Sequence, residues 1–123
     1  MNSLINFKRI DHVNISIPKG KEDEAREFYT GVLGLQEIPK PASLIANGGL
    51  WYQIADFELH LGVEAEVALT RRHPAFEISD VAAARKLLES HVQIVEEPEI
   101  PGRVRFAFID PFGNRIELLQ MLT

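Results

Sequence analysis

The stretch that decides the fold is IDHVNISI at residues 10–17, in which apolar and polar residues alternate. Such alternation is typical of a β-strand that has one face in the hydrophobic core. A second alternating stretch, HPAFEIS, occupies residues 73–79. Each stretch is followed by a segment with helical spacing, so the sequence predicts a strand–helix plan that occurs twice.

The first half of the chain continues with a predicted helix over residues 22–33. Its apolar stripe is formed by Ala25, Phe28, Tyr29, Val32 and Leu33. Gly34 is expected to end this helix, because glycine is common just after a helix C-terminus. The strands that follow are expected near residues 35–38, 44–54 and 57–63, with a turn at Asn47-Gly48-Gly49.

The second half repeats this plan. Asp80 is expected to cap a helix over residues 81–90. The strands after it are expected near residues 92–96, 103–109 and 115–120, with a turn at DPFGN between the last two. The sequence therefore predicts an α+β fold of two βαβββ modules, at about residues 8–65 and 70–121, within one domain.

Composition excludes several classes of protein. The 123 residues suit a single domain, and the net charge of -5 argues against a nucleic-acid surface. The absence of cysteine excludes thiolate metal ligands and a cysteine nucleophile. No segment is as long and apolar as a membrane helix or a signal peptide, so we expect a cytoplasmic protein without a membrane or nucleic-acid partner.

Four residues on the polar faces of the predicted strands could bind a divalent metal. Aligning the two halves sets His12 opposite His73 and His60 opposite Glu117. Imidazole and carboxylate ligands suit zinc, nickel, iron(II) or manganese, and a site with open positions can also bind substrate. A histidine in a strand can equally be an ordinary hydrogen-bonded residue, and Glu58 shares a face with His60 and is an alternative ligand.

The same faces carry candidates for substrate binding. Trp51 could form a flat apolar wall, and Arg105 could bind a carboxylate or phosphate. Asn14 and Gln53 could supply further polar contacts. These faces could instead be open to water, and a pocket requires that the sheets curve into a cup. There is no glycine-rich phosphate loop and no G-x-S-x-G nucleophile motif.

At these residues the sequence resembles the vicinal oxygen chelate superfamily, which includes glyoxalase I, bleomycin-resistance proteins, fosfomycin-resistance transferases and extradiol dioxygenases. The segments that carry the resemblance are IDHVNISIP, EAREFYTGVLGL, ELHLG, HPAFEISD and DPFGNRIELLQ. It implies eight strands that curl into a cup around a metal, with His12, His73 and Glu117 as ligands. Glyoxalase-like members add a carboxylate or similar ligand where this chain has His60. That difference leaves open whether His60 is a ligand or an acid/base.

The resemblance implies a metal-dependent glyoxalase-like lyase or isomerase that acts on a small molecule with vicinal oxygens. The metal would act as a Lewis acid and stabilise an enediolate, while Glu117, His60 or Glu58 would move the proton. One alternative is an iron(II)-dependent dioxygenase that uses His12, His73 and Glu117. Another is a non-catalytic drug- or metabolite-binding protein of the bleomycin-resistance kind. A homodimer is expected, with sites built from one chain or from two.

Overall fold

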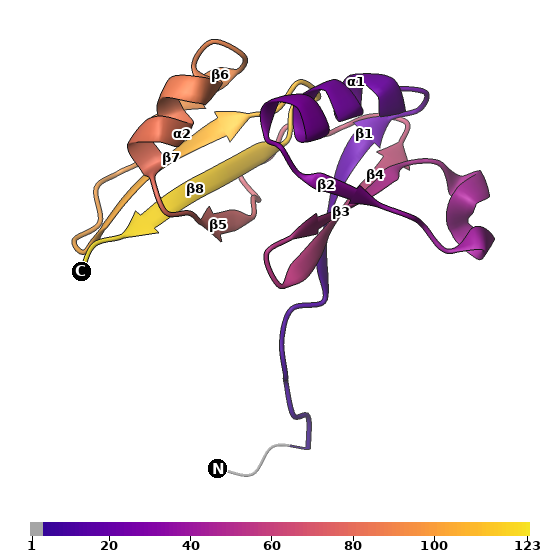
Figure 1. Ribbon diagram of the computed structural model, residues 1–123, viewed down its shortest axis with the longest axis horizontal. Helices are drawn as coiled ribbons and strands as arrows, with labels where there is room; N and C mark the ends of the chain where they lie inside the picture. Colours follow the sequence, from indigo (N-terminus) through magenta and orange to yellow (C-terminus); the bar gives the residue numbers. More distant parts are fainter. Residues whose placement is uncertain (1–3) are drawn as a thin grey trace.

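Two four-stranded sheets and the helices that connect their strands make up the computed structural model, which describes residues 4–123 (Figure 1). The strand order is β1-β4-β3-β2 in one sheet and β5-β8-β7-β6 in the other. The first strand of each module pairs in parallel with the last, and the other pairs are antiparallel. The two predicted βαβββ modules are therefore confirmed.

The elements follow the predicted order along the chain. The first module contains β1 (His12–Pro18), α1 (Glu22–Arg26), η1 (Glu27–Val32), β2 (Gln36–Ile38), η2 (Ala42–Asn47), β3 (Leu50–Ile54) and β4 (Phe57–Glu64). The second contains β5 (Ala75–Glu77), α2 (Val81–Leu88), β6 (Gln93–Val95), β7 (Arg103–Ile109) and β8 (Arg115–Met121). None of the helices in residues 4–123 is long and apolar enough to span a membrane.

The strand register reproduces the alignment of the two halves. Asn14 lies opposite His60 in the β1–β4 pair, and Ala75 lies opposite Glu117 in the β5–β8 pair. His12 precedes Asn14 by two residues, as His73 precedes Ala75, so each histidine enters its sheet at an equivalent place. The repeat thus places His60 and Glu117 on equivalent strands, as the sequence predicts.

The helix predicted over residues 22–33 forms, but its second half is wider than an α-helix. η1 is a π-helix, in which the backbone N–H of Leu33 donates to the carbonyl oxygen of Phe28, five residues earlier. A wider turn lets two consecutive aromatic residues, Phe28 and Tyr29, both face the interior, where they are 4% and 0% exposed. Gly34 follows the helix with a φ of 72°, as its predicted role as a helix stop requires.

The strand predicted over residues 44–54 begins only at Leu50, and this part of the prediction is wrong. Residues Ala42–Asn47 instead form the 3-10 helix η2. Gly48 and Gly49 have φ values of 73° and 84°, which interrupt any extended segment. A Cβ on Gly49 would lie 2.1 Å from the carbonyl oxygen of Leu61, so only glycine lets the chain enter β3 this close to β4.

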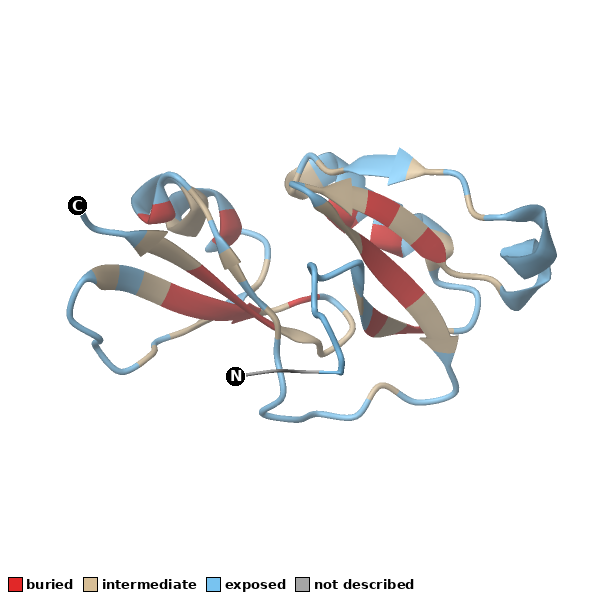
Figure 2. Ribbon diagram, turned by 90° about the horizontal axis from the view of Figure 1, so that it is seen from below, coloured by how far each residue is buried: buried red, intermediate tan, exposed pale blue. Residues whose placement is uncertain are grey.

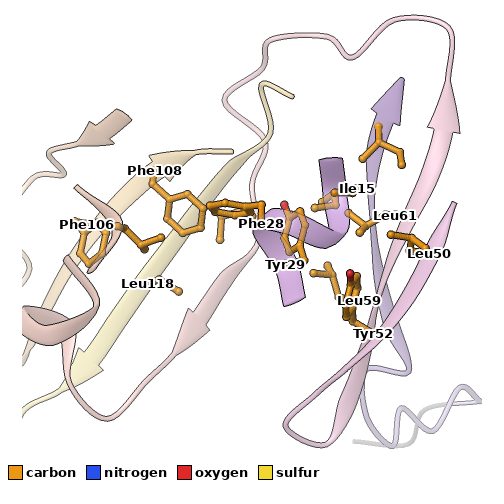
Figure 3. Packing of buried hydrophobic residues seen from close by; sticks show 14 of the residues in the cluster. Ile15, Phe28, Tyr29, Leu50, Tyr52, Leu59, Leu61, Phe106, Phe108 and Leu118 are labelled. Atoms are coloured by element: carbon orange, nitrogen blue, oxygen red, sulfur yellow. The ribbon is translucent and has the colours of Figure 1, made fainter. Parts of the chain in front are cut away.

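The hydrophobic core is continuous across both modules. Figure 3 shows Phe28 and Tyr29 between the two sheets, with Phe106 and Phe108 on one side and Leu59 on the other. The Phe28 and Phe108 rings lie 6.0 Å apart. Buried residues concentrate in the sheets and in the helix surfaces that face them, whereas η2 is exposed throughout (Figure 2). Apolar packing between α1/η1 and the second sheet therefore holds the modules together.

A buried hydrogen-bond network crosses the same junction. Asp110 is 3% exposed, and its carboxylate accepts a 2.6 Å hydrogen bond from the hydroxyl of Tyr29. Asp110 also accepts from the backbone N–H groups of Phe112 and Asn114 and from the side-chain amide of Asn114. That amide donates in turn to the carbonyl oxygen of Ser16 in β1, at 2.7 Å. The predicted DPFGN turn thus binds both β1 and η1 of the other module.

Replacing Tyr29 by phenylalanine should lower the free energy of unfolding by about 1–3 kcal/mol, because Asp110 would stay buried and lose a donor. Urea unfolding followed by circular dichroism measures this change. Tyr52→Phe is the matched control, since its hydroxyl shares a partly buried hydrogen bond with Thr30 only. An equal or larger loss in the control would contradict the special role of the Tyr29–Asp110 bond.

The difference between wild type and Tyr29→Phe should also depend on pH. Burial raises the pKa of Tyr29 well above its ordinary value of 10.0, and the nearby Asp110 carboxylate raises it further. The stability that Tyr29 contributes is therefore complete below pH 10 and declines at higher pH, where the tyrosine ionises in the unfolded chain alone. When the unfolding experiment is repeated between pH 8 and 11, the difference in free energy of unfolding between wild type and Tyr29→Phe should become smaller as the pH rises.

Candidate metal centre

The half of the candidate centre in the first module is a stack of three rings. β4 lies between β1 and β3, and the ring of His60 lies between those of His12 and Trp51. The centroid distances are 4.1 Å to His12 and 3.9 Å to Trp51, with interplanar angles of 13° and 3°. His60 is 8% exposed, while His12 at the sheet edge is open to solvent. The stack holds the buried imidazole firmly in place.

Each histidine of this half has a carboxylate partner. His12 Nδ1 lies 2.9 Å from Asp11 Oδ2, and a carboxylate only accepts, so Nδ1 carries the hydrogen. That hydrogen bond lowers the pKa of Asp11 below its usual value. It also leaves Nε2 of a neutral His12 with a lone pair for a metal. His60 differs, because its Nε2 lies 2.9 Å from Glu58 Oε1.

The half in the second module pairs a histidine with a buried carboxylate. His73 Nδ1 donates to the carbonyl oxygen of Arg71 at 2.7 Å, which again leaves Nε2 as the free nitrogen. His73 Nε2 lies 3.3 Å from Glu117 Oε1, and Glu117 is 5% exposed. An imidazole lone pair and a carboxylate this close could bind the same divalent metal ion.

One arginine side chain, that of Arg105, holds the Glu117 carboxylate of this half. Arg105 donates to Glu117 Oε1 at 3.0 Å, and its other guanidinium nitrogens donate to the carbonyl oxygen of Pro98. Next to it, the hydrogen bond from Arg115 lowers the pKa of Glu97. Arg105, predicted to bind a substrate anion, thus donates from Nη1 to Glu117, while its bonds to Pro98 fix the guanidinium in place. Nε of Arg115 and Nε of Arg103 are buried and have no hydrogen-bond partner within residues 4–123.

The four predicted ligands form two separate pairs. His12 and His60 meet in the first module, and His73 and Glu117 meet in the second. Across residues 4–123 of one chain, no three histidine, aspartate or glutamate side chains are close enough together to hold one metal ion. The donor types still fit a metal, because both edge histidines present Nε2 and the carboxylate is buried beside one of them. The remaining histidine, His91, lies after α2 and is exposed.

A pocket of about 470 Å³ adjoins the first half of the centre. Asn14, Trp51 and His60 line it, together with Lys40 from the loop before η2. Gln53, predicted to contact substrate, instead donates its amide hydrogens to the backbone of the β3–β4 turn. The pocket can therefore offer an aromatic wall, an amide and an ammonium group around His60.

Three contributors to these half-sites were not predicted from the sequence. Lys40 lies in a loop, where no strand alternation indicates which way a side chain faces. Asp11 directly precedes His12, and this adjacency was a usable signal, because an acidic neighbour can orient an imidazole. The backbone carbonyl of Arg71 has no sequence signal, since every residue carries one.

Comparisons with known proteins agree with this architecture. The pattern of the Glyoxalase/Bleomycin resistance protein/Dioxygenase superfamily matches residues 9–118. A putative glyoxalase family protein from Bacillus anthracis is 37% identical, covers 98% of this chain and 99% of its own, and superposes with a TM-score of 0.87. No curated protein matches the chain.

More distant solved structures share the fold. A glyoxalase/dioxygenase from Nostoc punctiforme is 24% identical, with a TM-score of 0.78 over 100% of this chain and 99% of its own. The fosfomycin resistance protein FosX from Listeria monocytogenes is 17% identical, with a TM-score of 0.73 over 96% and 93%. At these identities the similarity extends to the fold alone.

Arg105→Met should lower the free energy of unfolding by about 3 kcal/mol, because it leaves the Glu117 carboxylate buried without its cation. Chemical denaturation of the metal-free protein measures the change, so that bound metal does not mask it. In Arg105→Met/Glu117→Gln the loss should be smaller than in Arg105→Met, since no charge is left unpaired. A loss under about 1 kcal/mol in the single variant would show that water screens the pair.

Proposed function

The chain belongs to the glyoxalase/bleomycin resistance protein/dioxygenase superfamily, and we propose that it is a metal-dependent glyoxalase-like lyase or isomerase that acts on a small molecule with vicinal oxygens. One observation carries the proposal. His12 and His73, at equivalent places in the two modules, each donate Nδ1–H to an oxygen beside them in the chain and present Nε2. This arrangement is the one that metal-binding histidines use.

We place the metal between two copies of the chain. His12 of one copy, with His73 and Glu117 of the other, would complete the ligand set that one chain divides between its modules. β1 and β5 are the outer strands of their sheets, so each has an open edge at which the sheets of two copies can adjoin. A two-fold dimer would contain two metal sites, each within a cup of eight strands made from the first module of one copy and the second module of the other.

When bound, the metal would act as a Lewis acid toward the vicinal oxygens of the substrate. His60 is suited to move a proton, because Glu58 binds its Nε2 and the flanking rings of Trp51 and His12 hold its imidazole in the pocket wall. Lys40 and Asn14 line the same pocket and would bind polar or negatively charged parts of the substrate. Arg105 would position Glu117 for its role as a ligand.

Metal content tests the proposed ligands. Wild type purified without an affinity tag should carry about one divalent metal for each site formed between two chains of the dimer. His12→Ala, His73→Ala and Glu117→Ala should lose this metal. His91→Ala is the matched control, since this exposed histidine lies outside both half-sites. His60→Ala should keep the metal and lose turnover if His60 is the acid/base.

The element found separates the candidate functions. Nickel or zinc would support the lyase or isomerase, whereas iron(II) with oxygen consumption would support the dioxygenase. A wild-type protein that neither carries nor binds a metal on titration would overturn the proposal and favour the drug- or metabolite-binding function.

Mixing two defective variants tests whether the site spans two copies. In heterodimers of His12→Ala with Glu117→Ala, one cup carries both changes and the other is intact, so random pairing should restore roughly a quarter of the metal sites. His73→Ala mixed with Glu117→Ala is the control, because both changes lie in the second module and no intact cup can form. A site built within one chain would regain no metal in either mixture.

A further inference from the structure

A second, larger cavity lies between the two modules, apart from the candidate centre. Its volume is about 850 Å³, and its wall is mainly apolar, with side chains from both modules. Ile10, Phe57, Phe76 and Leu87 belong to this wall, and none of the four candidate ligands does. Ile10 and Leu87 are 64% and 48% exposed. An apolar surface of this extent that stays open to solvent is typical of a binding site for an apolar partner.

The segment that precedes β1 also exposes large apolar side chains. Residues 4–9, LINFKR, form an N-terminal arm that extends away from both sheets (Figure 1). Leu4 is 106% exposed and Phe7 is 87% exposed. Leu4 and Phe7 do not belong to the hydrophobic core of the described residues, so their burial requires an apolar surface elsewhere.

The arm does not turn into the cavity of its own chain. Arg9 Nη1 donates to the carbonyl oxygens of Ile10, at 2.9 Å, and Asp56, at 3.3 Å, and Arg9 Nη2 donates to Asp11. These bonds tie the base of the arm to the β3–β4 turn beside the cavity. Before this point the chain runs away from both sheets (Figure 1), and neither Leu4 nor Phe7 lines the cavity.

We propose that the cavity of each chain receives the N-terminal arm of a second copy, so that the two chains of a dimer exchange arms. Leu4 and Phe7 would enter the apolar wall. Lys8 of the arm complements Asp56 and Glu77, the two acidic residues of the cavity wall. Six extended residues reach on the order of 20 Å, enough to cross a dimer interface. The exchange rests on the dimer of the proposed function, and two-fold symmetry makes it reciprocal.

Engineered disulfides can test the exchange, because the chain contains no cysteine. Phe7→Cys/Leu87→Cys joins the arm to the cavity wall, and mild oxidation should convert most of the protein to a covalent dimer on a non-reducing gel. Peptide mass spectrometry should then find the arm of one chain linked to α2 of the other. Phe7→Cys/Lys86→Cys is the matched control, since Lys86 is exposed on α2 and lies outside the cavity wall. Phe7→Cys alone measures links between two arms.

The outcomes are distinct. A disulfide within one chain would show that the arm fills its own cavity and would overturn the exchange, as would a yield of linked dimer no higher than in the controls. The metal site is tested separately by its metal content. A metal-bound dimer without the link would overturn the arm exchange alone, and a linked dimer without metal would overturn the metal site alone.

Discussion

The hydrogen bonds of one buried carboxylate, Asp110, fix how the two modules meet. A charge this deep in a protein is tolerated only when donors surround it, and here they come from the DPFGN turn itself and from Tyr29 of the other module. Asn114 extends the network to the backbone of β1. With the aromatic residues of η1 packed beside it, this junction leaves little freedom for the sheets to shift relative to one another.

That junction also keeps the candidate metal ligands of one chain in two separate pairs. It places His12 and His60 on one module and His73 and Glu117 on the other, without gathering the four in one chain. Each half is nevertheless organised locally, since the groups that orient the histidines lie one or two residues away in the sequence. Half-sites of this kind need only the correct apposition of two sheets to become one centre, which is why a second copy enters the proposed function.

Sequence reasoning succeeded where a single periodicity governed the structure. β7 and the helix cap at Asp80 form as expected, because strand alternation and capping are local properties. It failed at η2, where the backbone conformation does not follow from any alternation of apolar and polar residues. There the positive φ angles of Gly48 and Gly49 and the close approach of Gly49 to the Leu61 carbonyl oxygen determine the conformation. The π-helix was likewise invisible, because it depends on aromatic packing across the junction.

The sequence by itself determined the repeat, the equivalence of the four candidate ligands and the family, because these depend on residue types at matched strand positions. Only the tertiary structure decided which ligands are neighbours and which donors are already in use. In the folded chain Gln53 donates to the backbone of the β3–β4 turn, and Arg105 donates to Glu117. The ring of His60 stacks between those of Trp51 and His12. The physical reason is that successive side chains of a strand point to opposite faces of the sheet, so the sequence alone predicts which face each side chain lies on. Contacts between residues of different modules depend instead on how the buried junction orients one whole sheet relative to the other.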